Sequence, residues 1–394
     1  MNTSPSWILP ASAKVGDIGL DSLDAQWCGG TVRQSLNAAA LAAGLSGSGD
    51  ADVITLTAGA VATAAALRGF IAASEQVPGD VLGRLAGPSG AWCDDASFGT
   101  PARLVRLRGG GSLTPERVAA ATLIEVPVKK PRSIRVPLAN TPGGAEVALV
   151  LADEVLCSTH THAGLLWANL LALPPTLWGQ LVGQSVVLGL ARMAWAVLRT
   201  RSLDPFVVAG RLNRVERGAR IHPSAVVEAC WVQAGAEIGP GAVVRGCIVG
   251  PGARVEAQTF VGFSVLGAGS CVQRMGWMSF SLLHAGAAHA GAMQLGVLGP
   301  DAAVKGGAVL MDQGVGQAVR VLVDGELRAT PLGMMGVGVG RESVVGSGVW
   351  VAPGRTIPPQ LTVLPPASDV LTRVDAAAAP GVYQIVGGGL ERVR

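Results

Sequence analysis

The sequence predicts an α/β domain followed by a parallel β-solenoid with three short sides to each coil. The solenoid is predicted by aliphatic residues that recur from Ile221 to Val272 at steps of six, five and six residues, a period of 17. A fixed short period is the sequence signature of stacked repeats. The α/β domain is predicted because the chain before this region lacks the period and alternates strand-like and helix-like segments.

The α/β domain is expected over residues 1–158. Trp7–Leu9 and Val53–Leu56 are rich in residues that favour strands, as are residues 123–128, 133–139 and 146–152. Residues 30–45 and 60–74 are Ala-rich and favour helices. Asp94 and Asp95 form an acid pair that we interpret as a solvated turn, with a metal site as the alternative.

An apolar helical connector is expected over residues 159–205. The chain has no charged residue between Glu154 and Arg192, and residues 176–198 look like one helix. A membrane span is the alternative, and with it membrane contact by the helices of residues 159–200, which we do not favour. A buried or amphipathic helix is favoured by two glutamines, several glycines and apolar residues at helical spacing: Gln180, Gln184, Leu177, Leu181, Leu188 and Trp195.

The solenoid is expected over residues 206–364, with a tail over 365–394. Equivalent residues one coil apart are expected to stack in columns, with Gly and Pro at the corners. Residues 273–297 and 311–338 break the spacing and are expected to hold loops, with a hairpin over 319–333 around Asp324-Gly325. The predicted interior columns are Ile221, Ile238, Val255 and Val272; Val227, Val244 and Val261; Val232, Val249 and Leu266; and Trp231, Ile248 and Val265, which should fill the shorter sides.

Composition narrows the class of protein. The net charge is only +3, with one Tyr and six Phe, which argues against nucleic-acid binding. The six cysteines lack C-x-x-C spacing, and the first residues lack the basic region of a signal peptide, so we expect a cytoplasmic protein with reduced thiols. Cys230 and Cys247 fall at the same place on neighbouring coils and are expected to stay free.

The repeat resembles that of the hexapeptide-repeat transferases, in units such as Ile238-GPGAV and Val249-GPGAR. The resemblance implies a left-handed parallel β-helix and a homotrimer. The order of the two domains resembles that of sugar-1-phosphate nucleotidyltransferases, some of which also acetylate an amino sugar. Their Gly-rich phosphate loop is not matched: residues 8–19 read ILPASAKVGDIG, with Lys14 and Gly16 but no G-T-R. We therefore assign no nucleotide-binding residue and expect a degenerate nucleotidyltransferase-like domain.

Histidines are the candidates for catalysis, because many hexapeptide-repeat transferases use one as a general base. His284 and His289, in LLHAGAAHAGA, each follow an expected interior residue, and either could face a cleft shared with a second subunit. We prefer His289, and the alternative is that both are polar corner residues. His160 and His162 could be two metal ligands, but with no third ligand nearby in sequence we expect ordinary hydrogen-bonded histidines and no metal site. His222 is expected at a surface corner.

Two functions are therefore compared. The first is acyl transfer from acetyl-CoA or another acyl thioester to a sugar or sugar-nucleotide acceptor. The second is a non-catalytic solenoid scaffold or binding protein. The histidine pair favours the first function, whereas the unmatched phosphate loop argues against nucleotidyl transfer.

Overall fold

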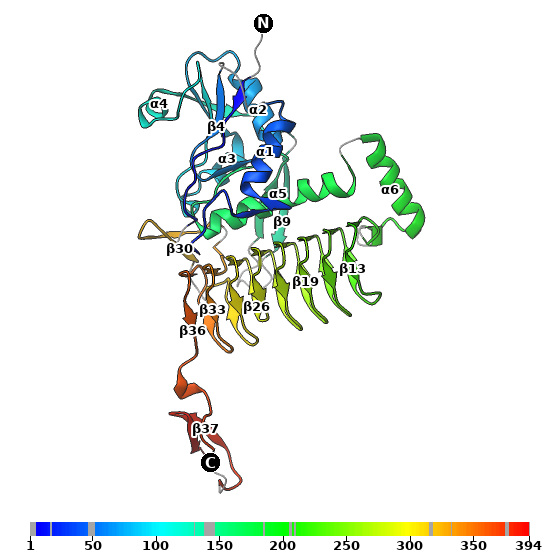
Figure 1. The fold of residues 1–394 in the computed structure, drawn as a ribbon, viewed down its shortest axis with the longest axis vertical. Coiled ribbons are helices and arrows are strands. Elements are labelled where there is room, and N and C mark those ends of the chain that lie inside the picture. The colour runs from blue at the N-terminus through cyan, green and yellow to red at the C-terminus, as the bar shows by residue number, and fades with distance from the viewer. Residues whose placement is uncertain are drawn as a thin grey trace.

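The computed structural model describes residues 5–15, 18–45, 52–129, 131–137, 146–183, 186–204, 207–208, 210–314, 318–331, 333–374 and 378–393. Figure 1 shows the α/β domain and the solenoid lying side by side, with one long helix between them. A small C-terminal hairpin extends away from the last coil.

The α/β domain is built on a five-stranded mixed sheet of order β1-β4-β7-β6-β8. β7 runs antiparallel to both of its neighbours, whereas β1 is parallel to β4 and β6 is parallel to β8. The strands are β1 (Ser6–Trp7), β4 (Val53–Leu56), β6 (Val81–Leu85), β7 (Leu104–Leu107) and β8 (Thr122–Val126). Three two-stranded pairs add β2 (Gln26–Trp27) with β3 (Gly30–Thr31), β5 (Ala60–Ala62) with β11 (Leu156–Ser158), and β9 (Arg132–Pro137) with β10 (Glu146–Leu151).

Three helices of this domain, α1, α2 and α4, begin after threonine residues whose side chains cap them. Thr31 accepts a hydrogen bond from the backbone N–H of Gln34, and Thr63 accepts one from that of Ala66. The helix predicted over 60–74 therefore begins at residue 64, after the strand β5. The helices are α1 (Val32–Ala42), α2 (Ala64–Ser74), α3 (Gly87–Cys93), the single turn η2 (Ala96–Phe98) and α4 (Pro115–Ala120).

The connector holds two helices, so the single helix expected over residues 176–198 is wrong. α5 (His162–Leu181) begins after the capping residue Thr161, and α6 (Val186–Thr200) follows it as a separate helix. None of the helices in the described part of the chain is long and apolar enough to cross a membrane.

The solenoid confirms the predicted parallel β-helix and its 17-residue register. Ile221 pairs with Ile238, which pairs with Val255. The first solenoid sheet holds β12 (Arg214–Val215), β15 (Trp231–Val232), β18 (Ile248–Val249), β21 (Val265–Leu266), β24 (Leu282–Leu283), β27 (Val297–Leu298), β32 (Gly338–Val339) and β35 (Thr356–Ile357).

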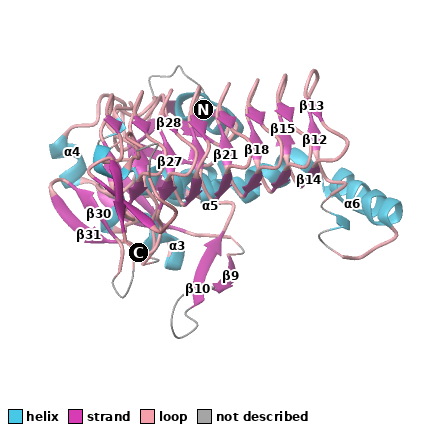
Figure 2. Ribbon diagram, turned by 90° about the horizontal axis from the view of Figure 1, so that it is seen from below, coloured by secondary structure: helices cyan, strands magenta, loops and turns pink. Residues whose placement is uncertain are grey.

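The second and third solenoid sheets complete the triangle that Figure 2 shows in stacked strands. The second holds β13 (Arg220–Ile221), β16 (Glu237–Ile238), β19 (Arg254–Val255), β22 (Cys271–Val272), β25 (Ala288–His289), β28 (Ala303–Val304), β33 (Val344–Val345) and β36 (Thr362–Val363). The third holds β14 (Val226–Glu228), β17 (Val243–Arg245), β20 (Phe260–Gly262), β23 (Trp277–Ser279), β26 (Ala292–Gln294), β29 (Val309–Leu310) and β34 (Trp350–Val351).

One predicted column exists but faces the other way. Trp231, Ile248 and Val265 stack as expected, yet they pack against the core of the α/β domain and not inside the coil. Neighbouring residues of a strand point to opposite faces. Because Val232, Val249 and Leu266 point inward, the residues before them must point outward. The interior places on this side belong instead to small residues: Cys230, Cys247, Ser264 and Ser281.

Cys230 and Cys247 lie inside the coil on neighbouring turns as free thiols, as predicted. The backbone N–H of Cys247 lies 3.4 Å from the Cys230 sulfur. Burial raises the pKa of the Cys247 thiol well above its ordinary value, so this thiol stays protonated.

The two segments that break the 17-residue spacing differ in structure. The prediction of loops over residues 273–297 is wrong, because this segment holds β23 to β27. The coil only shortens here to 15 residues, so that Trp277 pairs with Ala292. The described residues between β29 and β32 do leave the coil, and the predicted hairpin is confirmed as β30 (Arg320–Val323) and β31 (Glu326–Ala329). Its turn residues Asp324 and Gly325 both have positive φ, as a tight hairpin turn requires. The tail holds η3 (Ala367–Asp369) and the hairpin of β37 (Tyr383–Val386) and β38 (Gly389–Arg392).

Leu282 and Leu283 give a matched test of this arrangement, because both are fully buried but in different clusters. We expect Leu282→Ala and Leu283→Ala each to cost about 2–5 kcal/mol of the free energy of unfolding. Hydrogen exchange should show that Leu282→Ala loosens α5 and the α/β domain, whereas Leu283→Ala loosens the neighbouring coils. Loss of protection in the same amides in both variants would show that the two columns do not face apart.

Candidate functional site

His289 lies in the interior of the solenoid. It pairs with Val272 and Val304, so it occupies an aliphatic column and not the place after an interior residue. Its Nε2 lies 3.2 Å from the carbonyl oxygen of Trp277, which an N–H can donate to, while its buried Nδ1 has no hydrogen-bond partner among the described residues. Burial lowers the pKa of His289 to about 4, so the ring is neutral at neutral pH.

His284 is buried as well. It follows β24, and its Nδ1 lies 2.8 Å from the carbonyl oxygen of Leu298. Burial lowers its pKa to about 4. A general base must come within hydrogen-bond reach of the proton that it removes. Neither ring is accessible from the surface of the single chain, so a catalytic role for His289 or His284 stays a prediction that this geometry does not support.

The other histidines have local partners. His160 Nδ1 lies 2.8 Å from the Ser158 hydroxyl, and His162 Nδ1 lies 3.1 Å from the Thr356 hydroxyl of the solenoid. His222 lies exposed at a corner, where its Nδ1 is 2.8 Å from the Ser224 hydroxyl. Within the described ranges, no three His, Cys, Asp or Glu side chains gather in a way that could hold a metal ion.

The acid pair Asp94–Asp95 is not a free turn. Asp94 forms ion pairs with Arg84 and Arg103, and Asp95 caps η2 by accepting a hydrogen bond from the Ser97 N–H. The backbone of Lys14, in the predicted loop, forms an isolated antiparallel β-bridge with that of Asp21, and Gly16 lies outside the described residues. These residues therefore do not assemble a nucleotide site in the described part of the domain.

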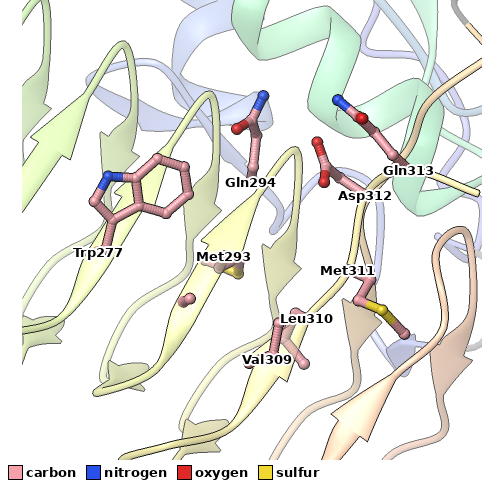
Figure 3. Close-up of a pocket in the computed structure, with 9 residues that line it drawn as sticks. Trp277, Met293, Gln294, Val309, Leu310, Met311, Asp312 and Gln313 are labelled. Carbon is pink, nitrogen blue, oxygen red and sulfur yellow. The ribbon is translucent and has the colours of Figure 1, made fainter. Parts of the chain in front are cut away.

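A pocket of about 260 Å³ opens on the outer side of the third solenoid sheet. It lies where the chain leaves the coil after β29 to form the insertion that carries β30 and β31. Figure 3 shows Trp277 and Gln294 on two neighbouring coils, with Asp312 and Gln313 of the insertion facing Gln294. The lining residues are Trp277, Ala292, Met293, Gln294, Val309, Leu310, Met311, Asp312 and Gln313.

Asp312 gives this pocket its chemistry. Its Oδ2 is buried and has no hydrogen-bond partner in the described part of the chain. Burial raises the pKa of the Asp312 carboxyl above its ordinary value. Its backbone is held because its carbonyl oxygen accepts a hydrogen bond of 2.8 Å from the Met335 N–H. A buried carboxylate without a partner is costly, and such groups cluster where a ligand or a proton supplies the missing partner.

The remaining walls suit a small polar ligand with an apolar face. The Trp277 indole is partly exposed and stacks on Phe260 with ring centroids 6.1 Å apart, which fixes its orientation. Gln294 and Gln313 offer amide donors and acceptors beside the carboxylate. An apolar wall with a few convergent polar groups is the usual composition of a small-molecule site.

Sequence reasoning missed this pocket because its parts come from three separate segments. Trp277 and Gln294 are residues of the repeat, and Asp312 lies in a stretch with no repeat pattern. The available signal was the point at which the period stops, since segments that leave a regular scaffold often carry function.

The buried histidines make stability depend on pH. The pKa values of His162, His284 and His289 are all lowered to about 4 by burial, whereas in the unfolded chain these residues bind protons near pH 6.5. The unfolded state therefore binds more protons between these values, and stability falls as the pH falls from 6.5 towards 4. Between these pKa values each histidine lowers the free energy of unfolding by about 1.4 kcal/mol for each unit that the pH falls. Urea unfolding of His289→Leu should show a pH dependence shallower by about one proton, and an unchanged slope would contradict the burial of this ring.

Comparisons with known proteins give only distant likenesses. No protein-family model and no curated protein matches the sequence. The chain is similar to a protein of Bacillus cereus, the product of the BC4754 gene, named as an acetyltransferase. The two sequences are 15% identical, the match covers 38% of this chain and 72% of that chain, and the TM-score is 0.24. It is also similar to the UDP-N-acetylglucosamine acyltransferase of Francisella novicida. Here the sequences are 14% identical, the match covers 38% of this chain and 64% of that chain, and the TM-score is 0.15.

The chain thus spans less than two thirds of the Francisella protein. At these identities and TM-scores the two likenesses carry no argument about activity, and the fold class rests on the strand register of this chain itself. That register has coils with three short parallel strands and aliphatic residues stacked inside at a 17-residue period. By its fold, the chain is a parallel β-solenoid protein with an α/β domain ahead of the solenoid.

Proposed function

We propose that the protein transfers an acyl group from a thioester, such as acetyl-CoA, to a hydroxyl or amine of a small acceptor that binds in the pocket of Trp277 and Asp312. The observation that carries the proposal is the buried carboxylate oxygen of Asp312, which lines the pocket and has no partner among the described residues. The acyl-transfer class comes from the resemblance of the repeat to hexapeptide-repeat transferases.

Asp312 is the proposed general base. Its carboxylate accepts the proton of the acceptor hydroxyl or amine while that oxygen or nitrogen attacks the thioester carbonyl carbon. The C–S bond then breaks, and the leaving thiolate takes the proton from Asp312, so that the carboxylate is restored. Burial favours this role because it raises the pKa of the Asp312 carboxyl towards the working pH of the reaction.

A sugar or the sugar of a sugar-nucleotide is the proposed acceptor. One face of a sugar ring carries C–H groups that can lie against the Trp277 indole, and its hydroxyls can bond to the Gln294 and Gln313 amides. These side chains would hold the acceptor in one orientation, which is how binding groups lower the entropy cost of a transfer reaction.

We further propose that the protein assembles as a homotrimer through the outer face of the third solenoid sheet. Val226, Trp277 and Trp350 are exposed large apolar residues of this face. A neighbouring subunit on this face would form part of the wall of the pocket, which is open in the single chain. The trimer itself is implied by the resemblance, and sedimentation velocity tests it.

The alternative proposal is a non-catalytic scaffold. The burial of His284 and His289 favours it, because the histidines expected to act in transfer are used inside the coil. The α/β domain favours it too, since Asp94 and Asp95 are engaged in ion pairs and a helix cap. Thiol release from a thioester in the presence of an acceptor separates the two functions, because a scaffold or binding protein catalyses no transfer.

Asp312→Asn tests the proposed function. With acetyl-CoA and a panel of sugars and nucleotide-sugars, thiol release by the Asp312→Asn variant should fall by about a hundredfold or more, because a general base is lost while the shape of the pocket is kept. Asp301→Asn is the matched control: Asp301 is exposed at a corner with a φ of 56°, a conformation that Asn tolerates, and turnover should not change.

The same assay tests the histidines. His289→Ala and His284→Ala should lower the free energy of unfolding, whereas the turnover of each folded molecule should stay close to that of the natural chain. Full activity of Asp312→Asn, with a hundredfold loss in His289→Ala, would contradict the role of Asp312 and support the histidine. Failure to bind any thioester, seen as no rise in thermal stability with added acetyl-CoA, would favour the scaffold.

A further inference from the structure

α6 presents its large apolar side chains to the outside. Figures 1 and 2 show this helix projecting from the body beside the first coils of the solenoid. Its inward face carries Gly189 and Ala196, which are buried, and Met193, which is half-buried. Its outward side chains are large and apolar, and they are exposed to 75% at Val187, 66% at Leu190, 56% at Trp195 and 75% at Leu198.

These four residues form one face. Successive residues of a helix are turned by about 100°, so Val187, Leu190, Trp195 and Leu198 fall within one side of the wheel. Ala191 and Ala194 lie between them and are also exposed. In an ordinary surface helix the large apolar residues face the protein, whereas these four large residues of α6 face away from it. We call these residues, Val187, Leu190, Ala191, Ala194, Trp195 and Leu198, the outer face of α6.

Positive charge borders this face. Arg192 and Arg199 lie next to it on the helix, and the Arg199 guanidinium sits 5.9 Å from the centre of the Trp195 ring. Residues 186–220 contain seven arginines, two acids and no lysine, a net charge of +5, whereas the whole chain has a net charge of +3. The positive charge of the protein is thus concentrated on α6 and on the start of the solenoid beside it.

We propose that α6 is an interfacial helix that docks the protein on the surface of an anionic phospholipid bilayer. Amphipathic helices with Trp and Leu on one face and arginine beside it lie in the plane of the interface, with the apolar face among the acyl chains. With 15 residues, α6 is about 22 Å long, which suits a helix lying on the surface and not one crossing it. Trp178 of α5 and Leu203, which follows α6 in the chain, are further exposed apolar residues.

Charge favours the bilayer over a second copy of this chain. Two outer faces packed together would bring Arg192 and Arg199 of one copy near those of the other, and α6 carries no acid to offset them. Phosphate and carboxylate headgroups instead supply negative charge at the level that arginine side chains reach when they extend along an apolar surface.

Vesicle sedimentation tests this proposal with the full chain. We expect binding to vesicles that contain phosphatidylglycerol, weak binding to pure phosphatidylcholine, and loss of binding as salt is raised. Leu190→Asp combined with Leu198→Asp should lower the partition coefficient at least tenfold. Arg192→Gln combined with Arg199→Gln should lower it by roughly fivefold for each arginine on anionic vesicles only.

The matched control is Val382→Asp combined with Val386→Asp, two exposed residues near and in the C-terminal hairpin, which should leave binding unchanged. All the substituted residues are exposed, so the melting temperature should stay close to that of the natural chain. The proposal is overturned if the natural chain does not bind anionic vesicles at low salt, or if the Leu190 and Leu198 substitutions leave binding intact. It is also overturned if those substitutions only lower the oligomeric mass, because a second copy then covers the helix.

Discussion

The packing of α5 along one outer face of the solenoid holds the two parts of the protein together. Ile248, Val265, Leu282 and Val297 point out of the coil into the same buried cluster as Leu165 and Leu166 of α5 and the core of the α/β domain. This face is apolar on both sides of its strands, inward and outward. Exposing this face to water would therefore lose the favourable free energy of burying its apolar side chains.

The two ends of this face show how closely the parts fit. At one end the Trp231 ring lies so near the backbone that a Cβ on Gly29 would come within 2.5 Å of it. At the other end Gly338 takes the place of an outward side chain, and a Cβ there would come within 2.8 Å of the His162 ring. His162 then reaches Thr356 of the next coil. This histidine, a possible metal ligand by its sequence pattern, is thus part of the contact between the domains.

The periodic part of the fold could be predicted from the sequence, because each coil repeats the same physical requirement for an aliphatic residue inside and a sharp corner. The direction of Trp231, Ile248 and Val265 could not be inferred from volume, since an outward apolar column needs a partner that lies far away in sequence. The placement of His289 was within reach of the sequence, because His289 lies 17 residues after Val272 and so continues the column of Ile221, Ile238 and Val255. It was missed because the two HAGA units were read as separate short sides, each with its histidine after an interior residue.

The candidate pocket follows from the insertion and not from the repeat. The hairpin of β30 and β31 packs on the α/β domain through Val321 and Val323. The strand that leads into it leaves Asp312 beside the outer face of the third solenoid sheet, with a buried carboxylate oxygen that has no partner in the described part of the chain. The sequence showed only that the period stops here. Neither the burial of Asp312 nor its nearness to Trp277 of an earlier coil has a local signature.

Hydrogen exchange at increasing urea concentration tests most directly whether the two parts share one core. Backbone amides would be followed in β4 and β7 of the α/β domain and in β21, β24 and β27 of the solenoid. A shared core predicts that both groups lose protection at the same urea concentration, in one cooperative transition. Two separate midpoints, with the solenoid strands protected after the α/β domain has exchanged, would contradict the account.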